Sequence, residues 1–401
     1  MSKPSVPLPV RRRSVVPCPA TVELMNTAGS KGVMADASTL GQRLIARIRE
    51  SGPITFAEYM ESALYDPDAG FYARPSVGDS GHFVTAPHVS PAFGDLLARQ
   101  IAECWDVLGR PRPFTLVELG AGDGTLALQV MMATRSVPDL AESLRYVAVE
   151  RSAGARKALS ETGIEADADV RSIEPVIGCV LANEVLDNVP FHRLRERRGR
   201  IVEILVGEKD GRLVEVEGTP SPQALGALRT PLRPGEERPV SPAALALVRD
   251  MAVSIARGYS FLFDYGFSGS EQPGPVHAYR NHRVLADVLD EPGTRDVTAA
   301  VDLDGVADEG RRAGLQVWGP VAQRQALLAL GYRLWASGVR RRQAEAEARE
   351  DWREANRLFG ARSRASILID PAKLGGLFLV ALGTEGLPPP TAVLGDRESG
   401  C

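Results

Sequence analysis

The chain has 401 residues, of which 44% are hydrophobic, and its formal net charge is only −4. This length suffices for one large domain or two ordinary ones, and the small net charge argues against a polyanionic partner. No apolar run approaches the roughly 20 residues that a membrane-spanning helix needs. The four cysteines are scattered and form no C-x-x-C pair, which is typical of a reducing compartment. The composition predicts a soluble intracellular protein.

The first 35 residues contain five prolines and three consecutive arginines, without a periodic apolar pattern. Such a segment buries too little apolar surface to fold, so we predict that residues 1–35 are disordered. A transit peptide is one alternative interpretation. A true start at Met25 or Met34 is another.

Helical patterns dominate the next part of the chain. Apolar residues recur at helical spacing in residues 38–51 and 92–108. A shorter helix is expected after Thr55, which is a suitable N-cap. Because these helices precede the glycine motif, we predict a helical cap over residues 36–112.

A glycine-rich motif, E-x-G-x-G-x-G, ends a short apolar segment that we predict to be a buried strand, residues 115–119. Glycine suits a sharp turn where a ligand approaches the backbone closely. The dinucleotide fingerprint G-x-G-x-x-G would need a glycine at Thr125. The pattern instead resembles the first motif of S-adenosylmethionine-dependent methyltransferases. The alternative is a glycine-rich turn that binds no ligand.

A second apolar segment, residues 146–149, ends at Glu150. An acid at this point of a βαβ unit can accept hydrogen bonds from both ribose hydroxyls, whereas an isolated acid after a strand is usually only a solvated strand end. Asp169 ends a short segment that we expect near the adenine. The predicted cofactor-binding residues are Glu118, Gly120, Ala121, Gly122, Gly124, Glu150, Asp169 and Asn183.

Strands and helices continue to alternate after Glu150. Apolar segments at 178–182, 260–264 and 377–382 predict three more strands, and residues 322–358 are predicted to be helical with a break near Gly338. This alternation predicts a mostly parallel, doubly wound α/β sheet.

The domain boundaries follow from these elements. We predict that residues 113–385 form the sheet domain, with hairpins and a loop inserted over 192–245. Within the insertion, residues 218–240 are rich in prolines and charges and are expected to be a solvated connection. Residues 386–401 are predicted to be a flexible tail.

Polar residues lie where the strand predicted at 178–182 ends, namely at Asn183, Glu184 and Asp187. Open α/β sheets bind their ligands at the carboxyl ends of the strands. In an in-line methyl transfer, carboxylates there could bind a guanidinium or amine nucleophile and take up its proton. Asp264 is a further candidate. The alternative is that Glu184 and Asp187 only cap the following helix.

Metal and nucleic-acid sites are disfavoured. The histidine pairs lack the i, i+4 helical spacing and a supporting cysteine cluster, so no metal is predicted. These pairs are His82 with His88, and His277 with His282. Arginine runs at 195–200 and 340–342 are interrupted or followed by acids, which is typical of solvated surfaces, so no nucleic-acid partner is predicted.

Several collinear motifs together resemble the MidA-type methyltransferase family, over about residues 54–382. They lie at residues 59–72, 81–87, 93–94, 117–125, 183–190, 264–266, 279 with 282, and 292–302. The resemblance implies a Rossmann-like, seven-stranded class I methyltransferase sheet with S-adenosyl-L-methionine as the cofactor. The family includes a mitochondrial assembly factor that symmetrically dimethylates an arginine of a complex I subunit.

The resemblance therefore implies a protein-arginine N-methyltransferase, with a complex I subunit as one candidate substrate. Its expected location is the cytoplasm of a bacterium, or the mitochondrial matrix if the source is eukaryotic. The alternatives are a small-molecule methyltransferase of secondary metabolism, or a catalytically silent assembly or interaction protein on the same fold.

The chain departs from the family pattern outside the glycine motif. His82 and His88 stand where the family usually has Asp and Glu, and Ala300 stands where it has His. These departures lie in the predicted cap and in a late loop, where a substrate is expected.

Overall fold

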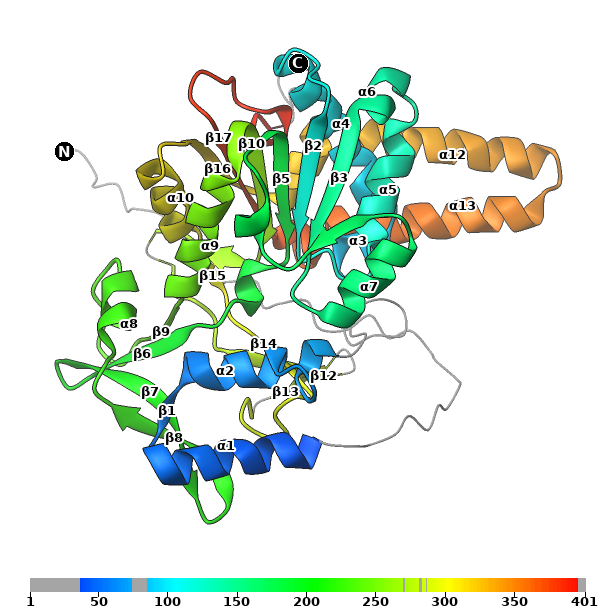
Figure 1. Cartoon of the computed structure of the whole chain (residues 1–401). Coiled ribbons are helices and arrows are strands. Elements are labelled where there is room, and N and C mark those ends of the chain that lie inside the picture. The colour runs from blue at the N-terminus through cyan, green and yellow to red at the C-terminus, as the bar shows by residue number, and fades with distance from the viewer. Residues whose placement is uncertain (1–36, 74–84, 270, 281–282, 286, 396–401) are drawn as a thin grey trace, which may run out of the picture.

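The computed structural model describes residues 37–73, 85–269, 271–280, 283–285 and 287–395. Its largest element is a seven-stranded sheet with the strand order β16-β17-β10-β5-β2-β3-β4 (Figure 1). The five strands β10, β5, β2, β3 and β4 run parallel, β17 is antiparallel to β10, and β16 is antiparallel to β17. The predicted Rossmann-like α/β sheet is confirmed. Its strands are β2 (Phe114–Leu119), β3 (Leu144–Val149), β4 (Glu165–Asp167), β5 (Val176–Asn183), β10 (Ile255–Asp264), β16 (Gln316–Ala322) and β17 (Phe378–Gly383).

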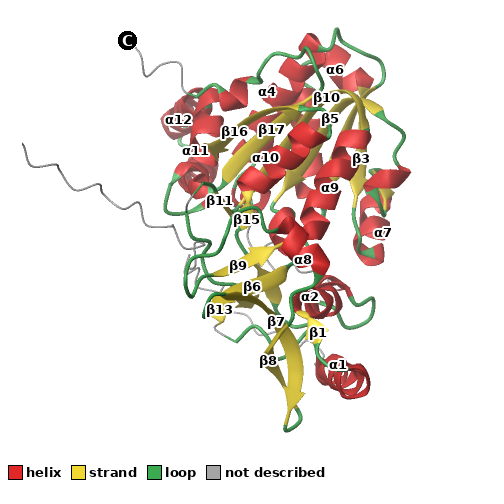
Figure 2. Ribbon diagram, turned by 90° about the vertical axis from the view of Figure 1, so that its left-hand side faces the viewer, coloured by secondary structure: helices red, strands yellow, loops and turns green. Residues whose placement is uncertain are grey.

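Helices cover both faces of this sheet (Figure 2). Phe93, Val130 and Leu327 belong to the core on one face, whereas Val248 and Val306 belong to the core on the other. Strand β2 is buried at every residue, as expected for a central parallel strand that is covered on both sides. The helices of the first face include α4 (Ala92–Val107), α5 (Thr125–Thr134), α6 (Pro138–Ser143), α7 (Ala153–Glu161) and α11 (Gln323–Ala329), and those of the second are α9 (Pro242–Val253) and α10 (Leu303–Arg312).

A second, smaller sheet lies beside the first, below it in Figures 1 and 2. Its strand order is β1-β7-β6-β9, with β8 paired to β7. Two helices, α1 (Ala37–Ser51) and α2 (Phe56–Tyr65), pack against it through a shared core. The strands are β1 (Ile54–Thr55), β6 (His192–Arg197), β7 (Arg200–Lys209), β8 (Arg212–Gly218) and β9 (Glu237–Val240).

The helices predicted to form one cap over residues 36–112 pack instead on two different sheets, which corrects the prediction. Ile54 pairs with Val206 of β7, so α1 and α2 belong with the inserted strands. Helix α4 instead packs on the seven-stranded sheet through Phe93 and Leu97. Sequence periodicity identifies an apolar helix face, but it does not show which distant strands cover that face.

The insertion predicted over 192–245 contains more structure than hairpins and a loop. Residues 218–240, expected to be a solvated connection, include α8 (Pro222–Ala227) and β9, with Ala224 and Val240 in a small core. Helix α9 begins at Pro242 and covers the large sheet. The inserted sheet therefore ends at about residue 240.

The carboxyl-terminal third also differs from expectation in two places. The predicted helix does not break at Gly338, which lies inside α12 (Tyr332–Ala348); the chain turns instead at Gly331 and before α13 (Trp352–Ala365). Gly331 has a φ of 90°, whereas a glycine inside a helix only weakens it. Together α12 and α13 form a hairpin that projects from the molecule (Figure 1).

The tail predicted as flexible over 386–401 is packed as far as it is described. Leu387 and Ala392 are buried, and the Ala392 N–H donates to Gln100 Oε1 at 2.8 Å. The remainder of that tail, and the disorder predicted for residues 1–35, lie outside the described residues. Among the helices that are described, none has the length and apolar composition needed to cross a bilayer.

The remaining strands form two small sheets, β11-β15 and β13-β12-β14, and one further α-helix, α3, has four residues. These elements are α3 (Ala86–Val89), β11 (Gly266–Phe267), β12 (His277–Arg280), β13 (Arg283–Leu285), β14 (Asp296–Thr298) and β15 (Val301–Asp302).

Candidate active site

The glycine loop lies at the carboxyl end of β2, where Gly120, Gly122 and Gly124 all have positive φ, between 55° and 79°. A side chain at Gly120 would place its Cβ 2.8 Å from the Val185 side chain, so this glycine permits close packing against the turn after β5. A Cβ at Gly122 would meet nothing within 4 Å. The backbone at Gly122 is thus bare and accessible, as a cofactor-binding loop requires.

Glu118 lies beneath the loop instead of within it. Glu118 is 4% exposed, and its carboxyl group accepts a 2.7 Å hydrogen bond from the Tyr146 hydroxyl of β3. Burial raises the pKa of Glu118 to about 8, although the Tyr146 hydroxyl opposes this rise. Ala121 is also largely buried.

The acid at the end of β3 contacts the loop directly. Glu150 Oε2 accepts a hydrogen bond from the Gly122 N–H at 3.0 Å, and its Oε1 accepts one from the Ser152 N–H at 2.8 Å. The sequence separates Glu150 and Gly122 by 28 residues, and the parallel pairing of β2 with β3 brings them together. Asp169 lies after β4, and its carboxylate is held by Arg171 at 2.9 Å.

The predicted reaction centre follows β5, in a turn that Asp264 of β10 organises. Asp264 Oδ2 accepts hydrogen bonds from the N–H groups of Val185, Leu186 and Asp187, at 3.2, 2.7 and 3.3 Å. Asp264 therefore caps this turn, a role that the sequence had left open for Glu184 and Asp187. Glu184 itself has a φ of 54°, a left-handed conformation that is uncommon for a residue with a side chain.

The Glu184 carboxylate is held by neutral donors. Its Oε1 accepts from the Ala86 N–H at 3.1 Å and from the Asn183 side-chain amide at 3.2 Å. Burial raises the pKa of Glu184 to about 7, partly offset by these two donors and by the nearby His88. A carboxyl group with such a pKa can exchange a proton near neutral pH.

A second group of acids lies next to Glu184. Asp187 is 8% exposed, and burial with the neighbouring Asp264, Asp296 and Glu184 carboxyls raises its pKa well above the ordinary value. The Asp187 Oδ1 and Asn183 Oδ1 atoms are buried without a hydrogen-bond partner among the described residues. Such atoms are rare in native proteins, so their unused acceptor capacity calls for a hydrogen-bond donor from a ligand or a water.

Asp296 was not singled out as a site residue from the sequence. It lies on β14, where Asn188 and Tyr72 donate to its Oδ1 at 2.8 and 3.2 Å. Burial raises its pKa to about 7 despite these donors. Tyr65 stacks on Tyr72 and donates to the Asn188 carbonyl. The only signal for Asp296 was its place in the collinear motif at 292–302.

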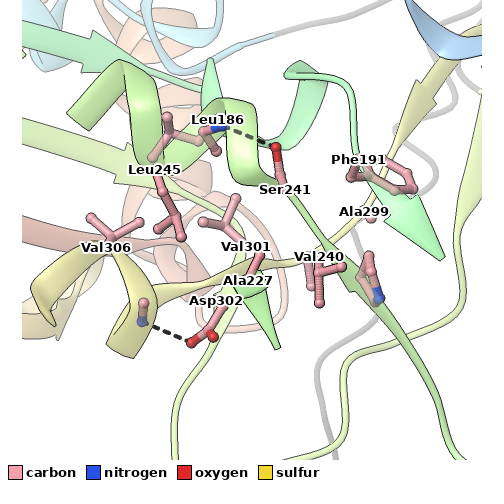
Figure 3. A pocket seen from close by; sticks show the side chains of 14 residues that line it. Leu186, Phe191, Ala227, Val240, Ser241, Leu245, Ala299, Val301, Asp302 and Val306 are labelled. Atoms are coloured by element: carbon pink, nitrogen blue, oxygen red, sulfur yellow. Dashed lines mark hydrogen bonds between the residues drawn. The ribbon is translucent and has the colours of Figure 1, made fainter. Parts of the chain in front are cut away.

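A small cavity is lined by Leu186, Val240, Ser241, Val301 and Val306, among others (Figure 3). Its volume is about 40 Å³. Ligand pockets typically enclose about 300–1,000 Å³, so this cavity does not accommodate the cofactor or a peptide.

A sheet of this strand order, with a glycine loop after its central strand and an acid after the next, is the architecture of class I methyltransferases. A family model of S-adenosyl-L-methionine-dependent methyltransferases matches residues 96–321. The chain belongs to this MidA-type family and uses S-adenosyl-L-methionine as its cofactor.

Relatives align over most of the chain. The chain is 31% identical to the mitochondrial protein arginine methyltransferase NDUFAF7 homologue of Drosophila melanogaster, over 88% of this chain and 86% of that protein. Human mitochondrial NDUFAF7 is 27% identical, over 76% of each chain. These relatives are named mitochondrial, so they give no support to the expected cytoplasmic location.

A solved structure of a methyltransferase-like protein is also similar to this chain. A protein from Burkholderia thailandensis, bound to S-adenosyl-homocysteine, has a TM-score of 0.78 and 27% identity, and the match covers 94% of this chain and all of that one. The fold is thus shared with a protein that binds the product form of the cofactor.

Proposed function

We propose that this methyltransferase transfers its methyl group to a guanidino nitrogen of an arginine in a protein. The observation that carries the proposal is a set of buried acids, which lie after β5, at the end of β10 and on β14. In the part of the chain that the structure describes, no arginine or lysine forms an ion pair with Glu184, Asp187, Asp264 or Asp296. Hydrogen bonds compensate Glu184, Asp264 and Asp296 only with neutral donors, and Asp187 Oδ1 has no partner among the described residues. A buried carboxylate is costly unless hydrogen bonds and a cation compensate its charge. A substrate guanidinium, which stays protonated at neutral pH, supplies that cation.

The residues also fit the cofactor. Gly122 offers a bare backbone, and Glu150 lies beside it with free lone pairs for ribose hydroxyls. Asn183, at the end of β5, has a side-chain oxygen without a partner among the described residues. When bound, the cofactor supplies the electrophilic methyl group. We therefore propose the eight predicted cofactor residues as its site, with Glu118 acting from below the loop and Asp169 at its outer edge.

In this site the acids of the chain orient the acceptor and receive its proton. Glu184, held by the Ala86 N–H and Asn183, would accept hydrogen bonds from the guanidinium and take up the proton released by methylation. Asp187 would bind the same cation through its unpartnered Oδ1. Asp264 holds the turn that carries both groups.

The relatives support this acceptor, because they are named protein arginine methyltransferases. The resemblance to complex I assembly factors makes a respiratory complex I subunit the first acceptor to test. We expect the enzyme to work where such a subunit is assembled, in the bacterial cytoplasm or the mitochondrial matrix.

The test is a methylation assay with labelled cofactor and paired peptides that differ only in Arg or Lys at one position. We expect methylarginine in the product hydrolysate from the Arg peptide and no label in the Lys peptide. If the label appears only in small amines, and in no protein or peptide, the result would contradict this proposal and support small-molecule methylation.

A further inference from the structure

Helix α3 touches both halves of the site. The N–H of its first residue, Ala86, donates to Glu184 Oε1 at 3.1 Å. Its His88 Nε2 lies 2.9 Å from Oδ2 of Asp123, which stands between Gly122 and Gly124 in the cofactor loop. A four-residue helix thus contacts the reaction-centre acid through its backbone and the cofactor loop through a side chain.

Both ring nitrogens of His88 are engaged. Nδ1 is 2.9 Å from Thr85 Oγ1, and the side chain is 11% exposed. Asp123 Oδ1 accepts from the Thr125 N–H at 3.0 Å. Burial opposes ionisation of Asp123, but the hydrogen bonds from His88 and Thr125 prevail and lower its pKa. An ionised carboxylate only accepts, so Nε2 is the donor to Asp123 and the imidazole is held in one orientation.

The backbone of α3 is held from the same side. The Gln129 side-chain amide on α5 donates to the Pro87 carbonyl at 2.8 Å. Gly94 makes this approach feasible, because a Cβ at that position would lie 2.4 Å from the Gln129 Cβ. Helix α5 begins at Thr125, directly after the glycine loop. Two independent contacts therefore connect α3 to the cofactor loop and the helix that follows it.

We propose that His88 is a positioning residue that couples the cofactor loop to Glu184 through α3. A cofactor that orders residues 120–124 restrains Asp123, then His88 and α3, and finally the Ala86 N–H that holds the Glu184 carboxylate. A continuous set of contacts between two sites can carry coupling of this kind, and the Asp123–His88 contact is one of its links. The inference rests on the methyltransferase class and is independent of the arginine acceptor.

The test measures amide hydrogen exchange of residues 85–90 in the full chain, with and without S-adenosyl-homocysteine. In the wild type, we expect S-adenosyl-homocysteine to slow the exchange of these amides. His88→Ala should still bind S-adenosyl-homocysteine, about tenfold more weakly, but binding should no longer slow the exchange. His192→Ala is the matched control. His192 is 14% exposed and its Nδ1 contacts Glu203 at 2.6 Å, but it lies in the inserted sheet. Equal slowing in His88→Ala and the wild type would overturn the proposal.

A double-mutant cycle provides the second readout. If His88 acts through Asp123, the double variant His88→Ala with Asp123→Ala loses no more affinity for S-adenosyl-homocysteine than Asp123→Ala alone, because both substitutions remove the His88–Asp123 contact. Additive losses would show that the two residues act separately, and would overturn the coupling. Neither readout needs a methyl acceptor, so a failure of the arginine proposal remains distinguishable from a failure of this one.

Discussion

Asp264 Oδ2 accepts a hydrogen bond from the Leu186 N–H at 2.7 Å, so a carboxylate at the end of β10 holds the turn that follows β5. The contact joins residues 78 positions apart in the sequence. Parallel pairing of β5 with β10 places Asn183 opposite Phe263 and thereby brings Asp264 under the turn. The conformation of the proposed reaction centre therefore depends on a neighbouring strand.

Replacement of Asp264 tests this dependence. Asp264→Ala leaves buried N–H groups without an acceptor, each of which costs about 1–3 kcal/mol. We expect the free energy of unfolding to fall by roughly 3 kcal/mol and methyl transfer to be lost. Asp351→Ala is the matched control, since Asp351 caps exposed helix α13 through the Glu354 N–H. It should cost about 1 kcal/mol and leave kcat unchanged.

Glu184→Gln keeps the shape of the side chain but removes its ability to take up a proton. General acid–base groups contribute about 10²- to 10⁴-fold, so we expect kcat to fall within that range. The affinity for S-adenosyl-homocysteine, measured by calorimetric titration, should change less than twofold. Wild-type kcat in the variant would contradict the role proposed for Glu184 and would favour a different proton acceptor.

The pH dependence of the reaction follows from the same residue. Burial raises the pKa of Glu184 to about 7, and the ionised form is the one that binds a guanidinium and accepts a proton. We therefore expect kcat/KM to rise with pH from 6 to 8 and then to level off. Because Asp264 and Asp296 also have pKa values of about 7, the profile reports an apparent value for the group. A profile that is flat over this range in the wild type would contradict the assignment.

Asp187 is expected to reduce stability in the free enzyme. Its pKa is raised by burial and by neighbouring carboxyls, so the folded chain holds this proton more tightly than the unfolded chain. The free energy of unfolding therefore falls as the pH rises from the unfolded pKa, about 3.9, through the folded pKa. Asp187→Asn removes this pH-dependent loss of stability. At pH 8 we expect the free energy of unfolding of the variant to be roughly 1 kcal/mol higher than that of the wild type, and its activity to be lower. Urea unfolding at pH 4 and pH 8 measures the difference, which should vanish at the lower pH.

Two glycines of the cofactor loop should respond differently to substitution. Gly122→Ala meets no protein atom, so its cost in stability is only that of positive φ, about 1–2 kcal/mol; the added methyl group should instead abolish binding of S-adenosyl-homocysteine. Gly120→Ala would contact Val185 at 2.8 Å and should lose more stability. Adding Val185→Ala should recover part of that stability. Calorimetric titration and thermal unfolding of the wild type and the three variants separate the effect on binding from the effect on stability. Undiminished binding of S-adenosyl-homocysteine by Gly122→Ala would contradict the assignment of this loop to the cofactor site.

The sequence by itself determined the elements whose signals are local. The glycine spacing after a short apolar run predicted the loop at 120–124, and alternating strands and helices predicted the parallel sheet. Glu150 and the group at 183–187 were predicted as site residues because ligands bind at the carboxyl ends of parallel strands. These features depend on neighbouring residues and on the spacing of apolar residues, and both can be read from a single sequence.

Only the tertiary structure decided which distant groups meet. It assigned α1 and α2 to the inserted sheet, placed Asp264 under the turn at 185–187, and brought Asp296 to within 2.8 Å of Asn188. It also connected His88 to Asp123. Such contacts arise from strand pairing and packing across tens to hundreds of residues. Local propensity does not encode these contacts, because an apolar face or a single acid is compatible with many partners.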